Sequence, residues 1–474
     1  MIEVNRNSII IRNVDFTSNE YMKFVKAFSI YDTIYHKFTS SIITTINKDI
    51  FVPASIGIES IRYYFPKKPV TYNNIAANTK EINFKCVHTP RNLLQEESIK
   101  FLNKLKFDNY NRQRFLSLPT GSGKTFITIM MASIFKVKTM VVVDKEQLAT
   151  QWKNNFLLHS NINKERIKIL SGMDSVEDAK AHTDDYDIYI AIHRTLGMLI
   201  EKDPNSLNNL NNKLGIGFRV FDEAHTNFKN ICTINALSNV EYTLYLTATP
   251  SRSNFRENTL YGKVFRKIPY FNGLDQKEIG RYINVAIYKY TTSPDDKTKI
   301  SCQTPKGFSA QLWGRWVENG GYEAFLNTVK DIFTKFKLIE QNTKTAIVLP
   351  TINLINKLKI DLDEFLNLDC GLFIGQGVTE EARAEALNKL VFITNPKMFG
   401  EAIDVQDLEV LINFVPFTSE VRLEQLMGRI RYGEDKSHVY IDAIDVGFNK
   451  MKTQLYARKK FYQKTAKSIK EMKI

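Results

Sequence analysis

The segment LSLPTGSGKT, residues 116–125, decides how the rest of this chain is interpreted. It begins as an apolar strand, and a helix is expected to begin near Lys124. Between the two, Gly121 and Gly123 let the backbone turn sharply, so that amide N–H groups can surround a phosphate chain. The helix N-terminus adds positive potential at the same point. The segment therefore predicts a phosphate-binding loop in which Lys124 reaches the β- and γ-phosphates and the Thr125 hydroxyl ligates Mg²⁺.

One position of this loop departs from the strict pattern, which has glycine where this chain has Leu118. The match is therefore to a looser form in which that position varies. A chance Gly-Ser-Gly turn is the alternative. The preceding strand and the Lys-Thr pair that follows favour the phosphate loop strongly over it.

A second segment, RVFDEAH at residues 219–225, is an apolar strand that ends in two carboxylates. In parallel sheets this edge is where ligands bind. Asp222 is expected to hold Mg²⁺ through water, and Glu223 to orient and deprotonate an attacking water. His225 would link the nucleotide site to the neighbouring strand end. An acidic pair after a strand is often only a helix cap, but together with the phosphate loop it predicts a nucleotide-hydrolysing site.

A third segment, LTATPSR at residues 246–252, carries small hydroxyl residues at a strand end. These hydroxyls can hydrogen-bond to His225 and to a second domain. A simple turn explains the segment equally well when it is taken alone.

Short apolar runs alternate with longer amphipathic segments through most of the chain, which is typical of parallel strands and crossover helices. The runs lie at 115–118, 139–143, 188–192, 218–221, 243–247, 284–290, 345–349, 371–374, 391–394, 408–412 and 438–442. The rhythm pauses at about 250–280 and around 291–299. Two α/β domains in tandem are therefore expected.

The two ends of the chain differ from this pattern. Residues 1–85 hold Ile-rich and aromatic pieces and are expected to form a small, mainly β or α+β accessory module. Residues 86–270 and 271–449 are expected to form the two α/β domains. Residues 450–474 carry nine Lys/Arg and one Glu, with Met451, Leu455, Tyr462, Ala466 and Ile469 on one helical face. This basic C-terminal helix is either a solvated helix packed on the second domain or an added phosphate-contacting surface.

Composition narrows the class of protein. The 474 residues are 43% hydrophobic and carry a net charge of +14, so we expect a folded, multidomain protein with a polyanionic partner. No apolar run approaches the length of a membrane span, and no signal peptide is recognisable. Four well-separated cysteines make a zinc site or a disulfide framework improbable and indicate a reducing, cytoplasmic compartment.

These segments, in this order, resemble the first motor domain of superfamily 2 helicases, and the resemblance spans about 90–445. In the second domain, QLMGRIR at 425–431 resembles the arginine-finger motif, and residues 394–404 resemble the motif that couples ATP to nucleic acid. The family usually has its second arginine three residues after the first, where this chain has Tyr432. Either Arg431 serves in its place, or Arg429 is the only finger.

The resemblance implies a two-domain RecA-like α/β fold with ATP and Mg²⁺ held between the domains. It assigns phosphoryl-transfer roles to Lys124, Asp222, Glu223, His225, Gln425, Arg429 and Arg431, with Thr125 and Asp222 at the metal. It assigns ATP binding to Arg91, Gln95, Thr120, Gly121, Ser122, Gly123, Lys124, Thr125, Gly400 and Asp404. It assigns nucleic-acid contacts to Lys145, Gln151, Arg194, Thr195, Arg252, Thr351 and Thr394.

Within the superfamily, the compact layout and the TATPSR spelling at 247–252 are similar to the XPB-like branch, which includes phage UvsW-type branch-migration helicases and the poxvirus transcript-release helicase. Only 42 residues follow Tyr432, which leaves no room for the accessory domains of splicing-type, RecQ-type or RecG-type enzymes. The implied activity is ATP-dependent unwinding or remodelling of single-stranded, forked or branched DNA in recombination, replication or repair, by a monomer. The implied compartment is a bacterial host cytoplasm or a viral replication site.

Three alternatives remain open: a helicase acting in transcript release or on RNA, a duplex-DNA translocase subunit of a restriction system, and a nucleic-acid-binding module with an inactive ATPase. The last is disfavoured because Lys124, Asp222, Glu223 and Arg429 are all present.

Overall fold

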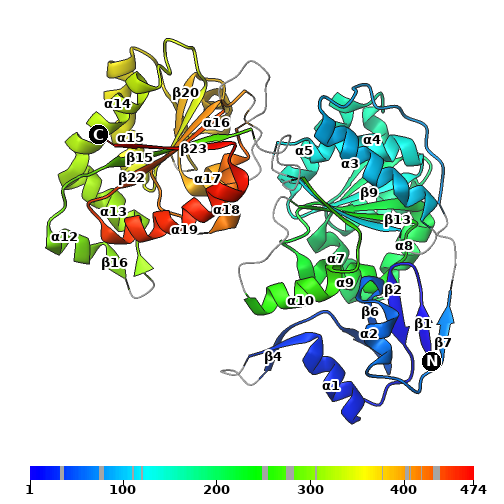
Figure 1. The fold of residues 1–474 in the computed structure, drawn as a ribbon. Helices are drawn as coiled ribbons and strands as arrows, with labels where there is room; N and C mark the ends of the chain where they lie inside the picture. The colour runs from blue at the N-terminus through cyan, green and yellow to red at the C-terminus, as the bar shows by residue number, and fades with distance from the viewer. Residues whose placement is uncertain are drawn as a thin grey trace. The chain divides into compact units, whose positions relative to one another are not determined.

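The chain is described here from a computed structural model, which places residues 1–32, 37–73, 79–108, 112–118, 121–247, 255–273, 282–304, 307–375, 377–400, 405, 407–417, 419–430 and 438–473. The chain divides into a first unit, Met1–Leu118 with Gly123–Gly273, and a second unit built mainly from Leu274–Ile474 (Figure 1). Each unit is organised around one large parallel sheet, as the apolar runs predict.

The sheet of the first unit has seven strands among the described residues, and every neighbouring pair is parallel. Its spatial order is β10 (Ile167–Leu170), β11 (Ile188–Ile192), β9 (Lys138–Val143), β12 (Ile216–Phe221), β13 (Tyr242–Thr247), β8 (Gln113–Ser117) and β14 (Tyr270–Asn272). The central strands β8, β9, β11 and β12 are buried along their whole length, because helices cover both faces of the sheet. A strand that is buried on both faces reads as a continuous apolar run, so these strands were visible in the sequence.

Two groups of helices cover the faces of this sheet (Figure 1). One face carries α3 (Leu93–Asn103), α4 (Lys124–Phe135) and α5 (Glu146–His159), which contact one another in series. The other carries α6 (Met173–Ala181), α7 (His193–Lys202), α8 (Ser206–Leu214) and α9 (Phe228–Leu237). Helix α10 (Phe255–Phe265) and the short turns η2 (Lys104–Phe107) and η3 (Lys164–Arg166) complete the unit.

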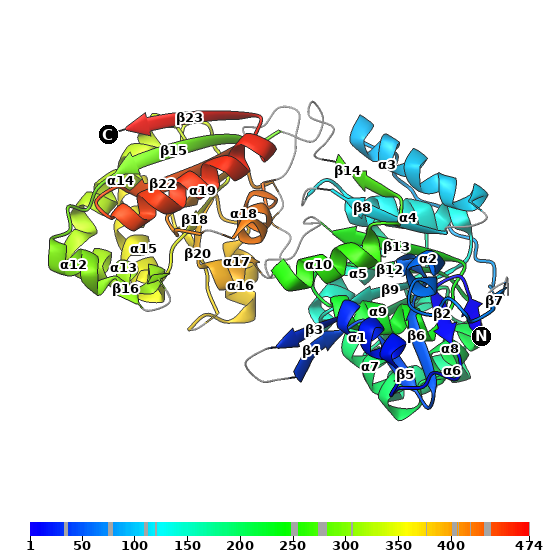
Figure 2. The same cartoon turned by 60° about the horizontal axis from the view of Figure 1, so that its bottom comes forward.

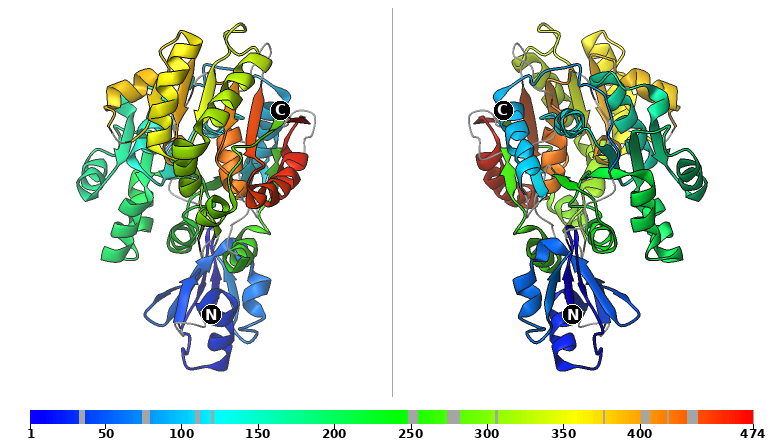
Figure 3. Two further views of the ribbon diagram at one scale, coloured as in Figure 1. Left: turned by 90° about the vertical axis from the view of Figure 1, so that its left-hand side faces the viewer. Right: turned by 90° about the vertical axis from the view of Figure 1, so that its right-hand side faces the viewer.

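The N-terminal residues form a smaller sheet of the order β5 (Thr44–Ile46), β6 (Asp49–Pro53), β2 (Ser8–Ile11), β1 (Ile2–Val4) and β7 (Val70–Tyr72). All its neighbouring pairs are antiparallel except β1 with β7. A separate hairpin, β3 (Ser29–Asp32) with β4 (Lys37–Ser41), and helices α1 (Asn19–Ala27), η1 (Ala54–Ile56) and α2 (Ile58–Arg62) accompany the sheet. Figure 3 shows these elements in blue, gathered into one α+β module.

This module packs directly on the first parallel sheet's helical layer. Its strands β2 and β6 contact α9, and its buried hydrophobic residues belong to the same cluster as residues of the parallel-sheet domain. The Asn7 side chain bridges the two parts, because its amide donates to Thr243 Oγ1 at 2.9 Å and its carbonyl accepts from the Val240 N–H at 2.9 Å. Arg6 also forms an ion pair with Glu241. The module and the parallel-sheet domain therefore share a core.

The second unit repeats the seven-stranded parallel arrangement within its described residues. Its order is β19 (Gly371–Phe373), β20 (Val391–Thr394), β18 (Thr345–Val348), β21 (Val410–Asn413), β22 (Val439–Asp445), β15 (Asn284–Tyr290) and β23 (Ser468–Lys473). The remaining elements are α12 (Asp296–Ser301), β16 (Gln303–Thr304), β17 (Gly307–Phe308), α13 (Ala310–Trp316), the π-helical turn η5 (Val317–Gly321), α14 (Tyr322–Lys335), α15 (Ile352–Leu366), α16 (Glu380–Ala386), α17 (Pro396–Gly400), α18 (Glu420–Met427) and α19 (Asn449–Thr465).

The C-terminal segment differs from the expected basic helix. Helix α19 ends at Thr465, and the chain then adds β23 to the sheet beside β15 (Figure 2). Met451, Leu455, Tyr462 and Ala466 are buried as the helical pattern predicts, whereas Ile469 lies on the strand and is 38% exposed. The expectation of one helix through residue 474 is therefore wrong after Thr465, because the strand can pair with an open sheet edge.

Candidate ATP site

The predicted nucleotide residues of the first unit meet at one edge of its sheet. The registers place Ser117 of β8 opposite Thr247 of β13, and Phe221 of β12 opposite Tyr245 of β13. The phosphate loop follows β8 and the carboxylates follow β12. Both therefore lie at the carboxyl ends of parallel strands, where α/β proteins bind their ligands.

The phosphate loop has the backbone that its glycines predict. Gly121 and Gly123 have φ of +82° and +92°, in the left-handed region that glycine adopts without strain. Lys124 opens α4, and its Nζ donates to the Leu118 carbonyl at 2.9 Å. The Leu118 side chain is fully buried, so the residue that replaces the expected glycine contributes to the core while its carbonyl faces the lysine. Ser122 is buried and Thr125 half-buried.

Gln95, predicted to read the nucleotide, lies directly against this loop. Asn92 caps α3 by accepting from the Gln95 N–H at 3.0 Å, which fixes the first turn of the helix. The Gln95 Oε1 accepts from the Arg91 N–H at 3.0 Å. A Cβ added at Gly123 would lie 2.3 Å from Gln95 Nε2. Because that amide is the flexible end of a side chain, it is the left-handed φ of Gly123 that requires glycine here.

The carboxylate segment leaves β12 in a tight, hydrogen-bonded turn. Asp222 Oδ1 accepts from the Glu223 N–H at 3.0 Å, and Glu223 itself has a φ of +45°, which is rare for a residue with a side chain. Strained backbone of this kind is retained where the surrounding structure holds it, and it clusters at functional sites. The Ala224 N–H donates to the Leu246 carbonyl at 2.8 Å, which fixes the turn against β13.

Burial raises the pKa of Asp222 to about 6, and the neighbouring Glu223 carboxylate adds to that rise. The Trp152 hydrogen bond and the charge of Lys124 act in the opposite direction. A cation bound beside Asp222 would favour its charged form in the same way. The Asp222 carboxylate and the Thr125 hydroxyl are hard oxygen donors, so they fit a Mg²⁺ ion that also binds substrate phosphates. Mg²⁺ usually keeps several waters and is held by one or two carboxylates together with substrate phosphates, so two protein oxygens are compatible with such a site.

His225 occupies the linking position that the sequence predicts. Its Nδ1 lies 2.8 Å from Thr247 Oγ1, at the end of β13, and 3.3 Å from Glu223 Oε2. The imidazole is nearly buried. It therefore joins the carboxylate turn to the start of the 247–252 segment.

The sequence places Trp152 at the end of the segment expected to contact the nucleic-acid strand, and no role at the ATP site was predicted for it. Its indole Nε1 donates to Asp222 Oδ2 at 2.8 Å, and its side chain is 3% exposed. Nothing in the spacing of the sequence joins residues 152 and 222. The only indication in the sequence was the presence of a tryptophan, because the N–H of a buried indole usually finds a hydrogen-bond acceptor.

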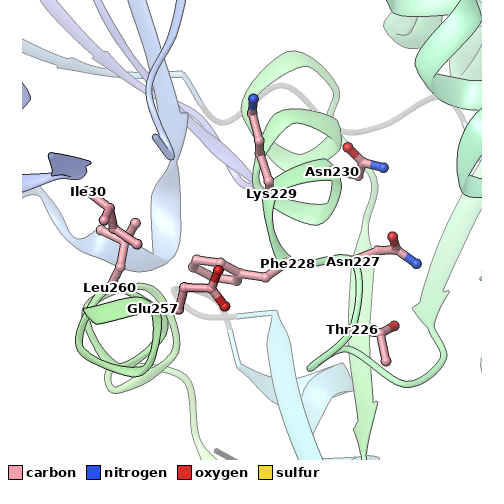
Figure 4. Close-up of a pocket in the computed structure, with 8 residues that line it drawn as sticks. All are labelled: Ile30, Thr226, Asn227, Phe228, Lys229, Asn230, Glu257 and Leu260. Atoms are coloured by element: carbon pink, nitrogen blue, oxygen red, sulfur yellow. The ribbon is translucent and has the colours of Figure 1, made fainter. Parts of the chain in front are cut away.

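A hollow of about 160 Å³ lies beside the carboxylate segment (Figure 4). Its walls come from Thr226–Asn230, from α10 and from the N-terminal module, and they consist of Ile30, Thr226, Asn227, Phe228, Lys229, Asn230, Glu257 and Leu260. The N-terminal module thus reaches the residues that follow the carboxylate turn at 222–224. Asn227 also donates to Asp144 Oδ1 at 2.7 Å.

The nucleic-acid contacts predicted in the first unit differ in exposure. Lys145 and Arg194 are exposed, and Gln151 is half-buried. Thr195 is 3% exposed, and its Oγ1 accepts from the Gly172 N–H at 2.9 Å. The hydroxyl of Thr195 thus holds the loop at Gly172, and any contact with a strand would come from its neighbours.

The second unit carries the other predicted residues near the carboxyl ends of its strands. Thr351 follows β18 as the N-cap of α15, and the buried Thr394 hydroxyl donates to the Phe373 carbonyl at 2.8 Å. Gly400 ends α17, which contacts α18. Gln425 lies in α18, and Arg429 follows it, both half-buried. Thr120, Arg252, Asp404 and Arg431 lie outside the described residues.

This geometry defines a nucleotide-binding protein with two RecA-like parallel-sheet domains. A family model described as "Type III restriction enzyme, res subunit" matches residues 88–252, the segment that holds the phosphate loop and both carboxylates. In its motifs and in the relatives below, the chain is similar to superfamily 2 helicases.

Three relatives match most of the chain. It is 24% identical over 367 residues to the Acanthamoeba polyphaga mimivirus protein L396, which carries the name of an ATP-dependent RNA helicase; the match covers 75% of this chain and 64% of L396. It is 24% identical to the DNA 3'-5' translocase XPB2 of Sulfurisphaera tokodaii, covering 71% and 78% of the two chains. It is 22% identical to the transcript termination protein A18 of Yaba-like disease virus, covering 77% and 74%.

Solved structures agree on the fold. The Hef helicase domain of Pyrococcus furiosus superposes with a TM-score of 0.52 at 15% identity, covering 77% of this chain and 98% of that one. Dbp5 of S. cerevisiae, bound to RNA and ADP BeF3, has a TM-score of 0.52 at 12% identity, covering 80% and 89%. Both confirm the two-domain α/β architecture.

Proposed function

We propose that this chain is an ATP-dependent DNA helicase or translocase that unwinds or remodels branched DNA in recombination, replication or repair. The observation that carries the proposal is the meeting of the phosphate loop, Lys124 and the Asp222–Glu223 pair at one edge of the first RecA-like sheet. The similarity to the archaeal DNA 3'-5' translocase supports DNA, because it extends over 71% of this chain and 78% of that one.

The catalytic cycle follows from the residues present. Lys124 and the loop amides bind the ATP phosphates, and Thr125 and Asp222 would hold Mg²⁺, which neutralises phosphate charge when bound. Glu223 takes the proton from the attacking water, with its carboxylate placed by the turn and by His225. Arg429 of the second unit supplies positive charge to the transferring phosphoryl group. Loss of the γ-phosphate then changes how the two domains are held, and repeated cycles move the protein along a strand.

The net charge of +14 supports a polyanionic partner. Contacts between Lys or Arg and phosphates release counterions, so binding should weaken steeply as salt rises. Because a motor must step over any base sequence, its contacts are expected at the backbone, through residues such as Lys145, Gln151 and Arg194. The N-terminal module is proposed to grip duplex or junction DNA. Among the described residues no helix is long and apolar enough to span a membrane.

Two other functions each have a specific observation in their favour. The mimivirus and poxvirus relatives favour work on RNA or on nascent transcripts. The family model of a restriction subunit favours duplex translocation without strand separation.

The deciding experiment measures ATP hydrolysis and strand displacement by the full chain on one panel of substrates. The panel contains single-stranded DNA, forks, Holliday junctions, plain duplex DNA, single-stranded RNA and RNA hybrids. We expect forks and junctions to stimulate hydrolysis most and to be unwound. Stimulation by RNA alone would overturn the DNA assignment, and hydrolysis on duplex DNA without strand displacement would favour the restriction-type translocase.

A further inference from the structure

Two side-chain hydrogen bonds tie the segment 144–152 to the carboxylate segment 222–227. The Trp152 indole donates to Asp222 Oδ2 at 2.8 Å, and the Asn227 amide donates to Asp144 Oδ1 at 2.7 Å. The anchors stand at the two ends of segment 144–152 and on either side of the catalytic turn. Just before the first anchor the backbones are also joined, because the Asp222 N–H donates to the Val142 carbonyl of β9 at 3.0 Å.

The segment between the anchors is the one proposed to contact the nucleic-acid strand. Lys145 is the N-cap of α5 and is exposed, and Gln151 immediately precedes Trp152 on the same helix. Helix α5 is a rigid element, so a force applied at Lys145 or Gln151 is transmitted to Trp152 without a loop to absorb it. Trp152 also packs against Phe156, with ring centroids 6.2 Å apart, which fixes the indole on the helix.

Both oxygens of Asp222 are engaged by protein donors. The Glu223 N–H holds Oδ1 at 3.0 Å, and the indole holds Oδ2. The orientation of the carboxylate is therefore set by the catalytic turn on one side and by α5 on the other. A shift of α5 moves the Trp152 indole and leaves the Glu223 N–H in place. Such a shift therefore rotates the Asp222 carboxylate or breaks its bond to the indole.

We infer that Trp152 is a positioning residue that couples strand binding on α5 to the phosphate site through Asp222, with the Asp144–Asn227 bond as the second anchor of the same link. The inference rests on the proposed function, since it requires a strand at Lys145 and Gln151. It names the path within the first unit by which nucleic acid stimulates ATP hydrolysis. A purely structural alternative is that Asp222 merely satisfies a buried indole, in which case any loss on mutation would appear as lost stability.

The test compares Trp152→Phe with a matched control, Trp313→Phe. Phenylalanine keeps one aromatic ring at both buried sites and removes the indole N–H, and the loss of side-chain volume is the same in both variants. Trp313 is likewise buried, and its Nε1 donates to a buried carboxylate, Asp445 Oδ2, at 3.2 Å in the second unit. Both variants therefore lose one indole–carboxylate bond, and only one of these bonds involves the ATP site.

Two quantities are measured for each protein. The first is the ratio of ATP hydrolysis with and without the nucleic acid that stimulates the wild type best. The second needs no turnover: it is the factor by which a non-hydrolysable ATP analogue with Mg²⁺ changes the affinity for a labelled oligonucleotide. Coupling between two sites typically changes affinity about 5- to 150-fold. We expect Trp152→Phe to reduce both factors by about tenfold, and Trp313→Phe to leave them near the wild-type values.

The outcomes separate the inference from the proposed function. If no nucleic acid stimulates the wild type, the proposed function fails whatever Trp152 does. If the wild type is stimulated and Trp152→Phe retains both factors, the inference fails while the function stands.

Should Trp152→Phe lose its cooperative unfolding transition, Asn227→Ala decides. It removes the other anchor without touching Asp222, and Asn227 makes no side-chain cap bond to α9. If the ATP analogue changes the oligonucleotide affinity of Asn227→Ala by a smaller factor than that of the wild type, the inference is supported. If the two factors are equal, the inference is overturned.

Discussion

The Nε atom of Arg458 donates to Asp442 Oδ2 at 2.9 Å, and both side chains are only 1% exposed. A second donor reaches the same oxygen, because the Tyr462 hydroxyl lies 2.8 Å away. Arg458 Nη1 also donates to the Phe417 carbonyl at 3.1 Å. One cation of the basic C-terminal segment is therefore a core residue that joins α19 to β22, out of reach of phosphate.

Replacing Arg458 should destabilise the second unit rather than weaken nucleic-acid binding. Arg458→Met leaves the Asp442 charge buried with no cationic partner, which typically costs about 3–5 kcal/mol. Urea denaturation measures the loss. Adding Asp442→Asn should recover part of it, since no buried charge then remains. Equal stability of the wild type and Arg458→Met would show that the pair contributes nothing to the fold.

Other lysines of α19 do face solvent. Lys452, Lys460 and Lys464 are exposed, and no acidic side chain is recorded as their ion-pair partner among the described residues. If this face contacts phosphates, replacing all three by Gln should make the dependence of log K on log salt shallower, by about 0.9 for each lost contact with duplex DNA. Fluorescence anisotropy across a salt series measures this slope.

The matched control for these lysines removes the same charge elsewhere. Lys164, Lys202 and Lys213 are also exposed, and Lys164 and Lys213 lie near the starts of β10 and β12, at the opposite edge of the first sheet from the ATP site. Their replacement by Gln should leave the slope near the wild-type value. Equal slopes for both triple variants would mean that α19 is a solvated helix.

The parallel sheets were predictable because their strands are buried on both faces. The apolar runs at 188–192 and 284–290 coincide with β11 and β15. The edge strand β23 was not recognised, because the apolar residues of its sequence SIKEMK, Ile469 and Met472, are three positions apart and so continue the pattern of the preceding helix. An edge strand forms only because a neighbouring strand is available to pair with it. For β23 this neighbour is β15, which is far away in the sequence, so the residues around β23 do not reveal the pairing.

The site was predictable where it depends on backbone shape. Gly121, Gly123 and the carboxylate turn follow β8 and β12 as their spacing indicates. Contacts between distant segments were not predictable, and Trp152 with Asp222 is the clearest case. Arg219 is another: it is fully buried inside β12, where burial lowers its pKa to about 10, and its partners Ser238 and Asn235 come from α9 and its C-terminal end. A charged residue in an apolar run gives no sign of which side chains will satisfy it.

The raised pKa of Asp222 predicts a pH-dependent cost of folding. The folded protein keeps this proton up to about pH 6, while the unfolded chain releases it near the ordinary aspartate pKa of 3.8. Because the folded pKa is the higher, the contribution of Asp222 to stability falls as pH rises between these values, by about 3 kcal/mol at most. Asp222→Asn cannot lose a proton, so its stability relative to wild type should increase from pH 4 to pH 7.

Urea denaturation of both proteins in a metal chelator, at a series of pH values, measures this difference. Comparing the two proteins at each pH cancels the other titrating groups and any constant effect of the amide. A difference that stays constant with pH would mean that Asp222 titrates normally in the folded protein.

Lys124→Ala should weaken nucleotide binding. The Lys124 ammonium is the one cation of the phosphate loop, and it lies at the N-terminus of α4, where its Nζ contacts the Leu118 carbonyl. Its removal would take away the proposed partner of the β- and γ-phosphates, and charge-assisted hydrogen bonds of this kind are worth about 1.5–3 kcal/mol. Titration with a fluorescent ATP analogue in the presence of Mg²⁺ should therefore show at least about tenfold weaker binding. Unchanged affinity would remove Lys124 from the phosphate site.

Glu223→Gln should separate turnover from binding. Glutamine preserves the size of the side chain and can occupy the same turn at φ +45°, but it cannot accept the proton of the attacking water. Removal of a general base typically lowers turnover by about 10²–10⁴-fold, while the phosphate contacts made by Lys124 and the loop remain. Steady-state hydrolysis and analogue binding are measured on the same preparation: kcat should fall, while the dissociation constant for the ATP analogue should stay within a few-fold of the wild-type value.

Asp222→Asn provides the contrast, because it removes a proposed metal-binding carboxylate and should impair Mg²⁺-dependent binding as well. Normal turnover in Glu223→Gln would mean that another group deprotonates the water, and His225, 3.3 Å from Glu223 Oε2, would be the next residue to replace.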